Sequence, residues 1–212
     1  MRFERKYRIE GMSQAALQQI IRLHPASFRS LYPDRQVNNI YLDTPQLTTF
    51  QQNVNGFNQR KKYRIRWYGN KLEQADFPQF EIKTKHNELG EKKNYELKSF
   101  ERLDLSLAIQ QIHQLHPEFS ALQASLMNTY ERSYLISFDG KFRLTIDRNL
   151  AYYSHKSQQP KVQAPILDPA LILEIKYEQK DDSFLDPITQ YLPFRQQKHS
   201  KYVQGVQLVF GF

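Results

Sequence analysis

One short segment, residues 62–69, restricts the fold of this chain more than any other. It reads Lys-Tyr-Arg-Ile-Arg-Trp-Tyr-Gly, and its residues alternate strictly in character. In a β-strand, Lys62, Arg64 and Arg66 would share one face, with aromatic and aliphatic side chains on the other. Guanidinium groups about 7 Å apart along a strand match the oxygens of an extended polyanion. A solvated outer strand face is the alternative explanation of the same pattern.

Several other segments have the same division into one apolar and one ionisable face. They are residues 3–9, 80–85, 142–147 and 171–177. Further strands are predicted at 37–42 and 130–138, and Asp139-Gly140 predicts a two-residue hairpin turn into the strand at 142–147. The period of the apolar residues predicts helices after an N-cap at Ser13 and over residues 105–115. Less regular segments predict short helices within 46–60, at 118–126 and at 185–192, a loop at 154–170 and a last strand at 203–210.

Two arrangements explain such strands. The charged faces can point outward around a dry sandwich, or the sheet can close into a barrel with a charged interior and amphipathic helices outside. Cations that line an empty barrel would repel each other by about a few kcal/mol per close pair. A highly charged anion removes that penalty, so the barrel predicts a polyphosphate or triphosphate site. Glu4, Asp147 and Glu174 are then candidates for holding a divalent cation through oxygen ligands.

Composition narrows the possible functions. The formal net charge of +8 indicates an acidic partner, such as nucleic acid, an anionic membrane or a phosphate compound. The chain has no cysteine, its first residues are charged without a following apolar run, and no stretch is apolar enough for a membrane span. We therefore expect a cytoplasmic protein. Glycine-rich phosphate loops, H-E-x-x-H and G-x-S-x-G are also missing from the sequence.

A set of motifs along almost the whole chain resembles the VTC domain, the polyphosphate polymerase domain of the vacuolar transporter chaperone complex. That domain is part of the triphosphate tunnel metalloenzyme superfamily, which includes the CYTH proteins. The motifs are F-E-R-K at 3–6, Y-R-I-R-W-Y-G at 63–69, E-I-K-T-K-H at 81–86, G-E-K-K at 90–93, Y-E-R at 130–132, F-R-L-T-I-D at 142–147, L-E-I-K-Y at 173–177 and S-K-Y at 200–202.

The resemblance implies an α+β fold over residues 1–212 as a single domain: an eight-stranded antiparallel closed β-barrel, the triphosphate tunnel, with helices packed on the outside. It implies a polyphosphate polymerase that transfers the terminal phosphate of ATP to a polyphosphate chain with Mn²⁺ or Mg²⁺. Glu174 would bind the metal, supported by Glu4 and Asp147. Catalytic roles fall to Arg64, Arg66, Lys83, Arg132 and Lys201, and substrate-binding roles to Lys6, Lys85, Arg143, Lys198 and Lys92.

The sequence is also compatible with other functions. An inorganic triphosphatase or tripolyphosphatase would use the same residues, and a non-catalytic polyphosphate-binding module is a third reading. CYTH enzymes begin with E-x-E-x-K, whereas this chain has Arg2 at the first glutamate, which weakens an adenylyl cyclase or plain triphosphatase assignment. Nucleic acid is a less suitable partner, because the aromatic residues alternate away from the cations. Any membrane association would need a membrane-protein partner.

Overall fold

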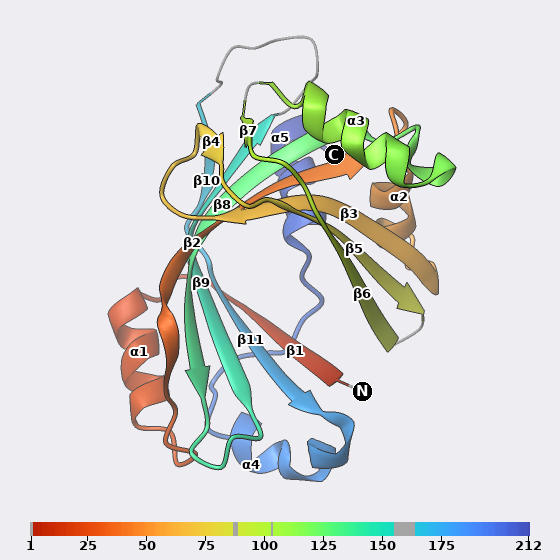
Figure 1. Cartoon of the computed structure of the whole chain (residues 1–212). Helices are drawn as coiled ribbons and strands as arrows, with labels where there is room; N and C mark the ends of the chain where they lie inside the picture. Colours follow the sequence, from red (N-terminus) through yellow and green to blue (C-terminus); the bar gives the residue numbers. More distant parts are fainter. Residues whose placement is uncertain (1, 87–88, 103, 155–163) are drawn as a thin grey trace. The chain divides into compact units, whose positions relative to one another are not determined.

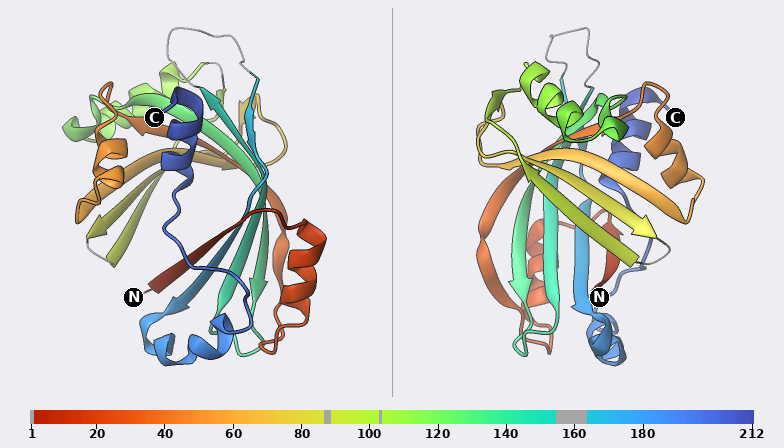
Figure 2. Two further views of the ribbon diagram at one scale, coloured as in Figure 1. Left: turned by 180° about the vertical axis from the view of Figure 1, so that it is seen from behind. Right: turned by 45° about the vertical axis from the view of Figure 1, so that its right-hand side comes forward.

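The computed structural model describes residues 2–86, 89–102, 104–154 and 164–212. The chain forms two compact units (Figures 1 and 2). Unit 1 comprises Met1–Arg35, Tyr130–Leu150 and Asp168–His199, and unit 2 comprises Gln36–Thr129, Ala151–Leu167 and Ser200–Phe212. A single domain over residues 1–212 stays a prediction.

Strands and helices follow one another in a mostly antiparallel α+β arrangement, as predicted. The strands are β1 (Arg2–Ile9), β2 (Arg29–Asp43), β3 (Gln59–Tyr68), β4 (Gln74–Ala75), β5 (Gln79–His86), β6 (Leu89–Glu96), β7 (Phe100–Glu101), β8 (Gln123–Ile136), β9 (Arg143–Ser154), β10 (Ile166–Asp168) and β11 (Leu171–Glu178). The α-helices are α1 (Gln14–Arg22), α2 (Thr48–Val54), α3 (Ser106–Leu115), α4 (Asp186–Thr189) and α5 (Lys201–Phe210), with 3₁₀ turns η1 (Pro117–Phe119) and η2 (Gln179–Phe184). None of the described helices is both long and apolar enough to cross a bilayer.

The large sheet has the strand order β1-β11-β9-β8-β2-β3-β5-β6, with β10 paired to β9, and β4 pairs with β7 in a separate sheet. Eight strands lie on this path, but over the described residues β1 and β6 are its ends, so the predicted closure into a barrel is not confirmed. The outer edge of β1, which does not pair with a strand of the described chain, is hydrogen-bonded by Gln197 of the same unit. The Gln197 amide donates to the Lys6 carbonyl at 3.0 Å, and the Gln197 side chain donates to the Arg8 carbonyl at 3.0 Å.

In unit 1, helices bury the apolar face of the strands. Alternate residues of β1, β9 and β11 pack with residues of α1 and α4, and α1 lies beside the strands (Figure 1). Ser13 caps α1, because its side chain accepts a hydrogen bond from the Ala16 amide at 3.2 Å. His24, at the end of this helix, is buried and contacts the Ile188 carbonyl through Nε2 at 2.8 Å, which agrees with a structural role.

In unit 2, α3 lies across β3 and β5 (Figure 1) and covers their apolar face. Ile65 and Trp67 of β3 are fully buried in this core together with Ala108 and Ile112 of α3. Each unit therefore has its own helix-on-sheet core. The sandwich alternative is wrong for these strands, since it requires two apolar sheet faces to pack directly on each other.

The C-terminal segment corrects the prediction of a strand at 203–210. It forms helix α5, capped by Ser200 and ended by Gly211 at φ +73. A Cβ atom at Gly205 would lie 2.4 Å from Leu126 and 2.5 Å from Tyr152, so only glycine permits this close approach. The β-branched and aromatic residues suggested a strand, but the buried positions follow the helical period.

Other predictions were partly right. The helix at 105–115 and the strands at 62–68, 80–85 and 171–177 are confirmed within a few residues. The helix predicted at 118–126 is wrong, because the described chain forms only the 3₁₀ turn η1 there before β8 begins at Gln123. Strand β6 and the first half of β2 are mostly exposed and were missed.

Two predictions fall partly outside the described residues. The turn predicted after His86 includes residues 87–88, and the loop predicted at 154–170 includes residues 155–163.

Candidate functional site

Unit 2 carries a cationic face, made by side chains of β3, β5 and β6 opposite the helix-covered core. The strand register places Lys62 opposite Lys83, and Lys83 opposite Lys92, so three lysines form one row across the sheet. Arg64 and Arg66 continue this face along β3. Because like charges directly opposite each other destabilise a sheet, this row favours a bound polyanion. The predicted alternation of residues 62–68 is confirmed.

Glu81 is the carboxylate at the centre of this cationic face, and it is buried. Its carboxyl oxygens lie 2.6 Å from Arg64 Nε, 2.6 Å from Lys92 Nζ and 3.9 Å from Arg66 Nη1. Burial by itself would raise the pKa of Glu81, but Arg64, Arg66 and Lys92 outweigh it and lower the pKa to about 2. Glu81 is therefore ionised and serves as an internal counter-ion of the cationic face.

This pairing predicts a pH-dependent contribution to stability. The pKa of folded Glu81 lies below its ordinary value of 4.5, so the stabilisation is full above about pH 4.5 and is lost as the pH falls toward 2. Lowering a pKa by this amount corresponds to roughly 3 kcal/mol. We expect Glu81→Gln to lower the free energy of unfolding by about that amount at pH 7 and to flatten its acid dependence, measured by urea denaturation at several pH values.

The matched control is Glu118→Gln, which removes an exposed carboxylate paired with Lys61 at 2.8 Å. An exposed pair of this kind contributes about 0–1 kcal/mol, so this variant should unfold almost as the parent does. Equal stability of the Glu81 and Glu118 variants at pH 7 would show that Glu81 is not a significant counter-ion.

The start of α5 lies at the lysine row. The Ser200 hydroxyl accepts a hydrogen bond from Lys62 Nζ at 2.8 Å, and Lys201 follows as the first, buried residue of the helix. Tyr202 donates to the Asp43 carboxylate at 2.5 Å, and Asp43 also accepts from the backbone amide of Thr49 at 2.9 Å. These bonds anchor the S-K-Y motif within unit 2. Asp43 was missed in the sequence, because it resembled an ordinary turn residue after a strand.

Unit 1 carries a face of mixed charge on β1 and β11. The register places Lys6 opposite Glu174 and Glu4 opposite Lys176, so the charges alternate in both directions. Lys6 Nζ lies 3.6 Å from Glu4 and 3.5 Å from Glu174, and Lys176 Nζ lies 3.7 Å and 3.3 Å from the same two carboxylates. The two glutamates thus share two lysines, and this face of unit 1 combines carboxylates with cations.

Arg132 lies beside this mixed face and forms a buried bidentate ion pair with Asp147. Its Nε and Nη2 atoms donate to the two carboxylate oxygens at 2.5 and 2.7 Å, and Nη2 lies 3.8 Å from Glu174. Burial disfavours the charged guanidinium, but Asp147 outweighs it and raises the pKa of Arg132 above its ordinary value. Arg132 therefore stays charged in a desolvated position next to Glu174.

Few carboxylates are available in unit 1 to bind a divalent cation. Among the described residues, no three or more acidic or histidine side chains are arranged to hold a metal ion. Both Asp147 oxygens bind Arg132, which leaves Glu174 and Glu4 as ligands. Mg²⁺ is commonly bound by one or two carboxylates together with substrate phosphates. The residues therefore fit a metal that binds together with a phosphate compound.

The sequence-predicted residues fall into two sets, one in each unit. Unit 2 contains Arg64, Arg66, Lys83, Lys85, Lys92 and Lys201, and unit 1 contains Glu4, Lys6, Arg132, Arg143, Asp147, Glu174 and Lys198. Arg143 and Lys198 are exposed, whereas Arg66, Arg132 and Lys201 are buried. Glu81 and Lys176 were not predicted as site residues. The alternation of residues 80–85 and 171–177 already placed both on the charged faces.

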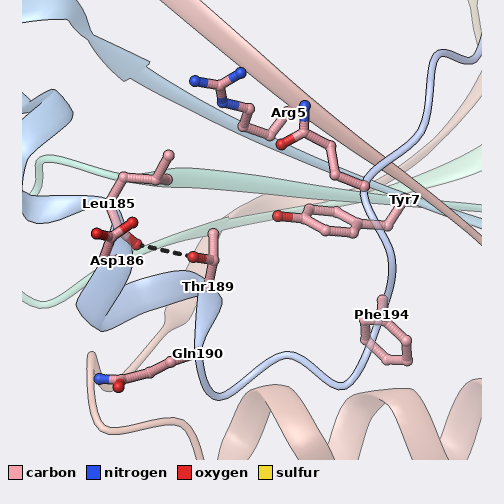
Figure 3. Close-up of a pocket in the computed structure, with 8 residues that line it drawn as sticks. Arg5, Tyr7, Leu185, Asp186, Thr189, Gln190 and Phe194 are labelled. Atoms are coloured by element: carbon pink, nitrogen blue, oxygen red, sulfur yellow. Dashed lines mark hydrogen bonds between the residues drawn. The ribbon is translucent and has the colours of Figure 1, made fainter.

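A pocket of about 590 Å³ lies elsewhere in unit 1 (Figure 3). Arg5 and Tyr7 of β1 line it, and they alternate with Glu4 and Lys6, so it opens on the other side of the strand. Its remaining lining includes Asp186 and Thr189, and Figure 3 shows both on the opposite wall from Tyr7. The pocket is therefore separate from the mixed-charge face.

Comparisons with known proteins agree with the resemblance. The sequence model of the VTC domain matches residues 1–210. Comparison with curated proteins gives no match. A solved structure from Vibrio parahaemolyticus, described as a "putative adenylate cyclase", has 16% identity, a TM-score of 0.55 and 95% coverage of both chains.

Two further structures have the same fold. A "putative adenylate cyclase" from Bacillus halodurans has 15% identity, a TM-score of 0.55 and 96% coverage of both chains. The protein PH1819 from Pyrococcus horikoshii has 10% identity and a TM-score of 0.53, with 97% of this chain and 96% of that chain covered. At these identities the structures show a shared fold. Because the domain model extends over nearly the full sequence, the chain belongs to the VTC domain family.

Proposed function

We propose that this protein is a metal-dependent phosphotransferase that takes the terminal phosphate of ATP and adds it to a polyphosphate chain. The observation that carries the proposal is the cationic face of unit 2. Three lysines stand in one row across β3, β5 and β6, two arginines extend the face, and Glu81 is a single buried counter-ion among them. Such a surface is stabilised by an anion that carries several charges along its length.

The chemistry needs positioning and charge neutralisation more than covalent participation of the protein. Arg64 and Arg66 bind phosphate oxygens as planar donors, and Lys62, Lys83 and Lys92 neutralise charge along the chain. Mn²⁺ or Mg²⁺, when bound, supplies Lewis-acid stabilisation of charge on the phosphate oxygens. Glu174 and Glu4 would hold that metal, and Arg132 lies close enough to Glu174 to orient its carboxylate.

Two observations support a phosphate compound over nucleic acid as the partner. Two aromatic side chains of β3 are buried in the core of unit 2, with Tyr63 8% and Trp67 1% exposed. They are therefore not available to stack on bases. Membership of the VTC domain family also supports phosphate chemistry, because residues 1–210 include all the motifs to which the resemblance assigns phosphate binding.

The test is an assay that measures two products separately. The chain is incubated with ATP, or with tripolyphosphate, in the presence of Mn²⁺ or Mg²⁺, and long-chain polyphosphate and free phosphate are both quantified. Long chains formed from ATP are the expected result. Free phosphate without chains would replace the proposal by a triphosphatase, and tight polyphosphate binding without turnover would replace it by a binding module. If the protein shows no turnover and no polyphosphate binding, the assignment of the cationic face as a polyphosphate site is wrong.

A further inference from the structure

Behind Arg66, two buried asparagines form a hydrogen-bond relay within unit 2. Arg66 Nε donates to Asn39 Oδ1 at 2.8 Å, and Asn39 Nδ2 donates to Asn128 Oδ1 at 2.8 Å. Arg66 is 7% exposed and both asparagines are fully buried. An arginine side chain has donors only, so the first bond fixes the orientation of the Asn39 amide, and Asn39 then fixes the orientation of Asn128.

The relay ends in a hydrogen-bond donor that lacks an acceptor. Asn128 Nδ2 is buried and has no hydrogen-bond partner among the described residues. Turning the amide over would not help, because it would direct Nδ2 of Asn128 toward Nδ2 of Asn39. A buried donor without a partner destabilises the folded state. Because the relay holds the amide of Asn128 in one orientation, we expect its Nδ2 donor to meet an acceptor from outside the chain.

The position of the relay identifies the kind of acceptor. Asn39 is the register partner of Arg66 in the β2–β3 ladder, so both side chains project on the cationic face. Asn128 meets Asn39 on that same side, away from the core that contains Ile65 and Trp67. An acceptor bound at Arg66 on this face would meet a guanidinium, and the relay directs the amide donor of Asn128 to the same side of the sheet. A phosphate oxygen accepts from both and also neutralises the arginine, whereas a neutral carbonyl does not.

We infer that Asn128 is a further substrate-binding residue, whose Nδ2 donates to an oxygen of the phosphate group bound at Arg66, and that Asn39 is a positioning residue that holds it there. This inference rests on the proposed function, because it uses the same phosphate compound. It extends the binding site from the charged residues of β3, β5 and β6 to an uncharged donor on β8.

Asn128→Asp tests the inference sharply. The aspartate still accepts the bond from Asn39, so the relay is kept, but the donor is lost and a negative charge faces the phosphate. We expect binding of tripolyphosphate and of ATP, each titrated with Mg²⁺ into the full chain by calorimetry, to weaken roughly 10-fold or more. The melting temperature is measured beside it, because a buried carboxylate is costly and the variant must be shown to remain folded.

Two more variants make the result specific. Gln110→Glu adds the same charge on an exposed position of α3, which covers the other side of the sheet, and should change binding less than about twofold. Asn128→Ala removes the donor without adding a charge and should weaken binding by a smaller factor than Asn128→Asp. If the aspartate variant does not fold, the alanine variant provides the answer; if neither folds, Asn128 is structural and the inference is wrong.

The outcomes separate this inference from the proposed function. Normal binding by Asn128→Asp, together with lost binding by a variant lacking Arg64 and Arg66, would overturn the role of Asn128 and leave the function intact. Normal binding by both variants would overturn the function itself. Weaker binding of ATP with unchanged binding of tripolyphosphate would mean that Asn128 contacts the nucleoside, which also contradicts the inference.

Discussion

Replacing Arg64 and Arg66 together by alanine is expected to weaken tripolyphosphate binding by roughly 100-fold or more, and to reduce turnover of ATP accordingly. Each hydrogen bond between a charged donor and a phosphate oxygen contributes about 1.5–3 kcal/mol, and two guanidinium groups are removed. The measurement is a calorimetric titration with tripolyphosphate, repeated at two salt concentrations. The salt dependence should also become less steep, because fewer cations contact the anion.

The matched control removes two cations from exposed positions outside the cationic face, Lys71→Ala with Lys98→Ala. This variant has the same net charge as the arginine variant and should bind tripolyphosphate within about threefold of the parent, since exposed charges at a distance are screened. Unchanged binding by the arginine variant would remove both arginines from the site.

The arginine variant also leaves Glu81 with fewer counter-ions, and its carboxylate would then repel an anion. A triple variant, in which glutamine replaces Arg64, Arg66 and Glu81, separates these effects. It lacks the buried negative charge, so a persistent loss of binding in this variant is due to the missing guanidinium groups. Recovery of binding in the triple variant would mean that repulsion by Glu81, and not loss of the arginines, caused the effect.

Asp147→Asn is expected to lower the free energy of unfolding by about 3–5 kcal/mol, because it leaves the buried Arg132 guanidinium without its carboxylate partner. For a domain of this size each kcal/mol lowers the melting temperature by about 2–4 °C, so the shift should exceed roughly 6 °C. Thermal and urea denaturation in the presence of a metal chelator measure this effect directly. The chelator matters because it removes any contribution of a bound cation to stability.

Two control variants test whether the loss of stability is specific to the buried pair of Arg132 and Asp147. Asp34→Asn removes a half-exposed partner of Arg148 in the same unit and should cost about 1 kcal/mol or less. A double variant, Arg132→Met with Asp147→Leu, removes both buried charges and should be nearly as stable as the parent, although it lacks the guanidinium beside Glu174. If Asp147→Asn is fully stable and loses only metal-dependent activity, Asp147 is a metal ligand and the ion pair is unimportant.

Several features of this protein follow from local patterns in the sequence. Alternation along residues 62–68 identified both the strand and its two faces, because side chains of an extended strand project alternately and a mixed face would expose apolar groups to water. The same reasoning placed Glu174 and Lys6 on charged faces. The motifs that resemble the VTC domain then indicated the family, which the comparison over residues 1–210 shows.

Tertiary structure decided what local patterns do not contain. Helix α5 packs closely against Leu126 and Tyr152, which are distant in the sequence, and Gly205 permits this approach because it has no Cβ atom. Glu81 is a counter-ion because strand pairing brings it to Arg64 and Lys92, and the donor of Asn128 is held by a relay across three strands. Sequence periodicity shows which side a residue faces, but its pairing depends on strand register and on contacts between distant segments.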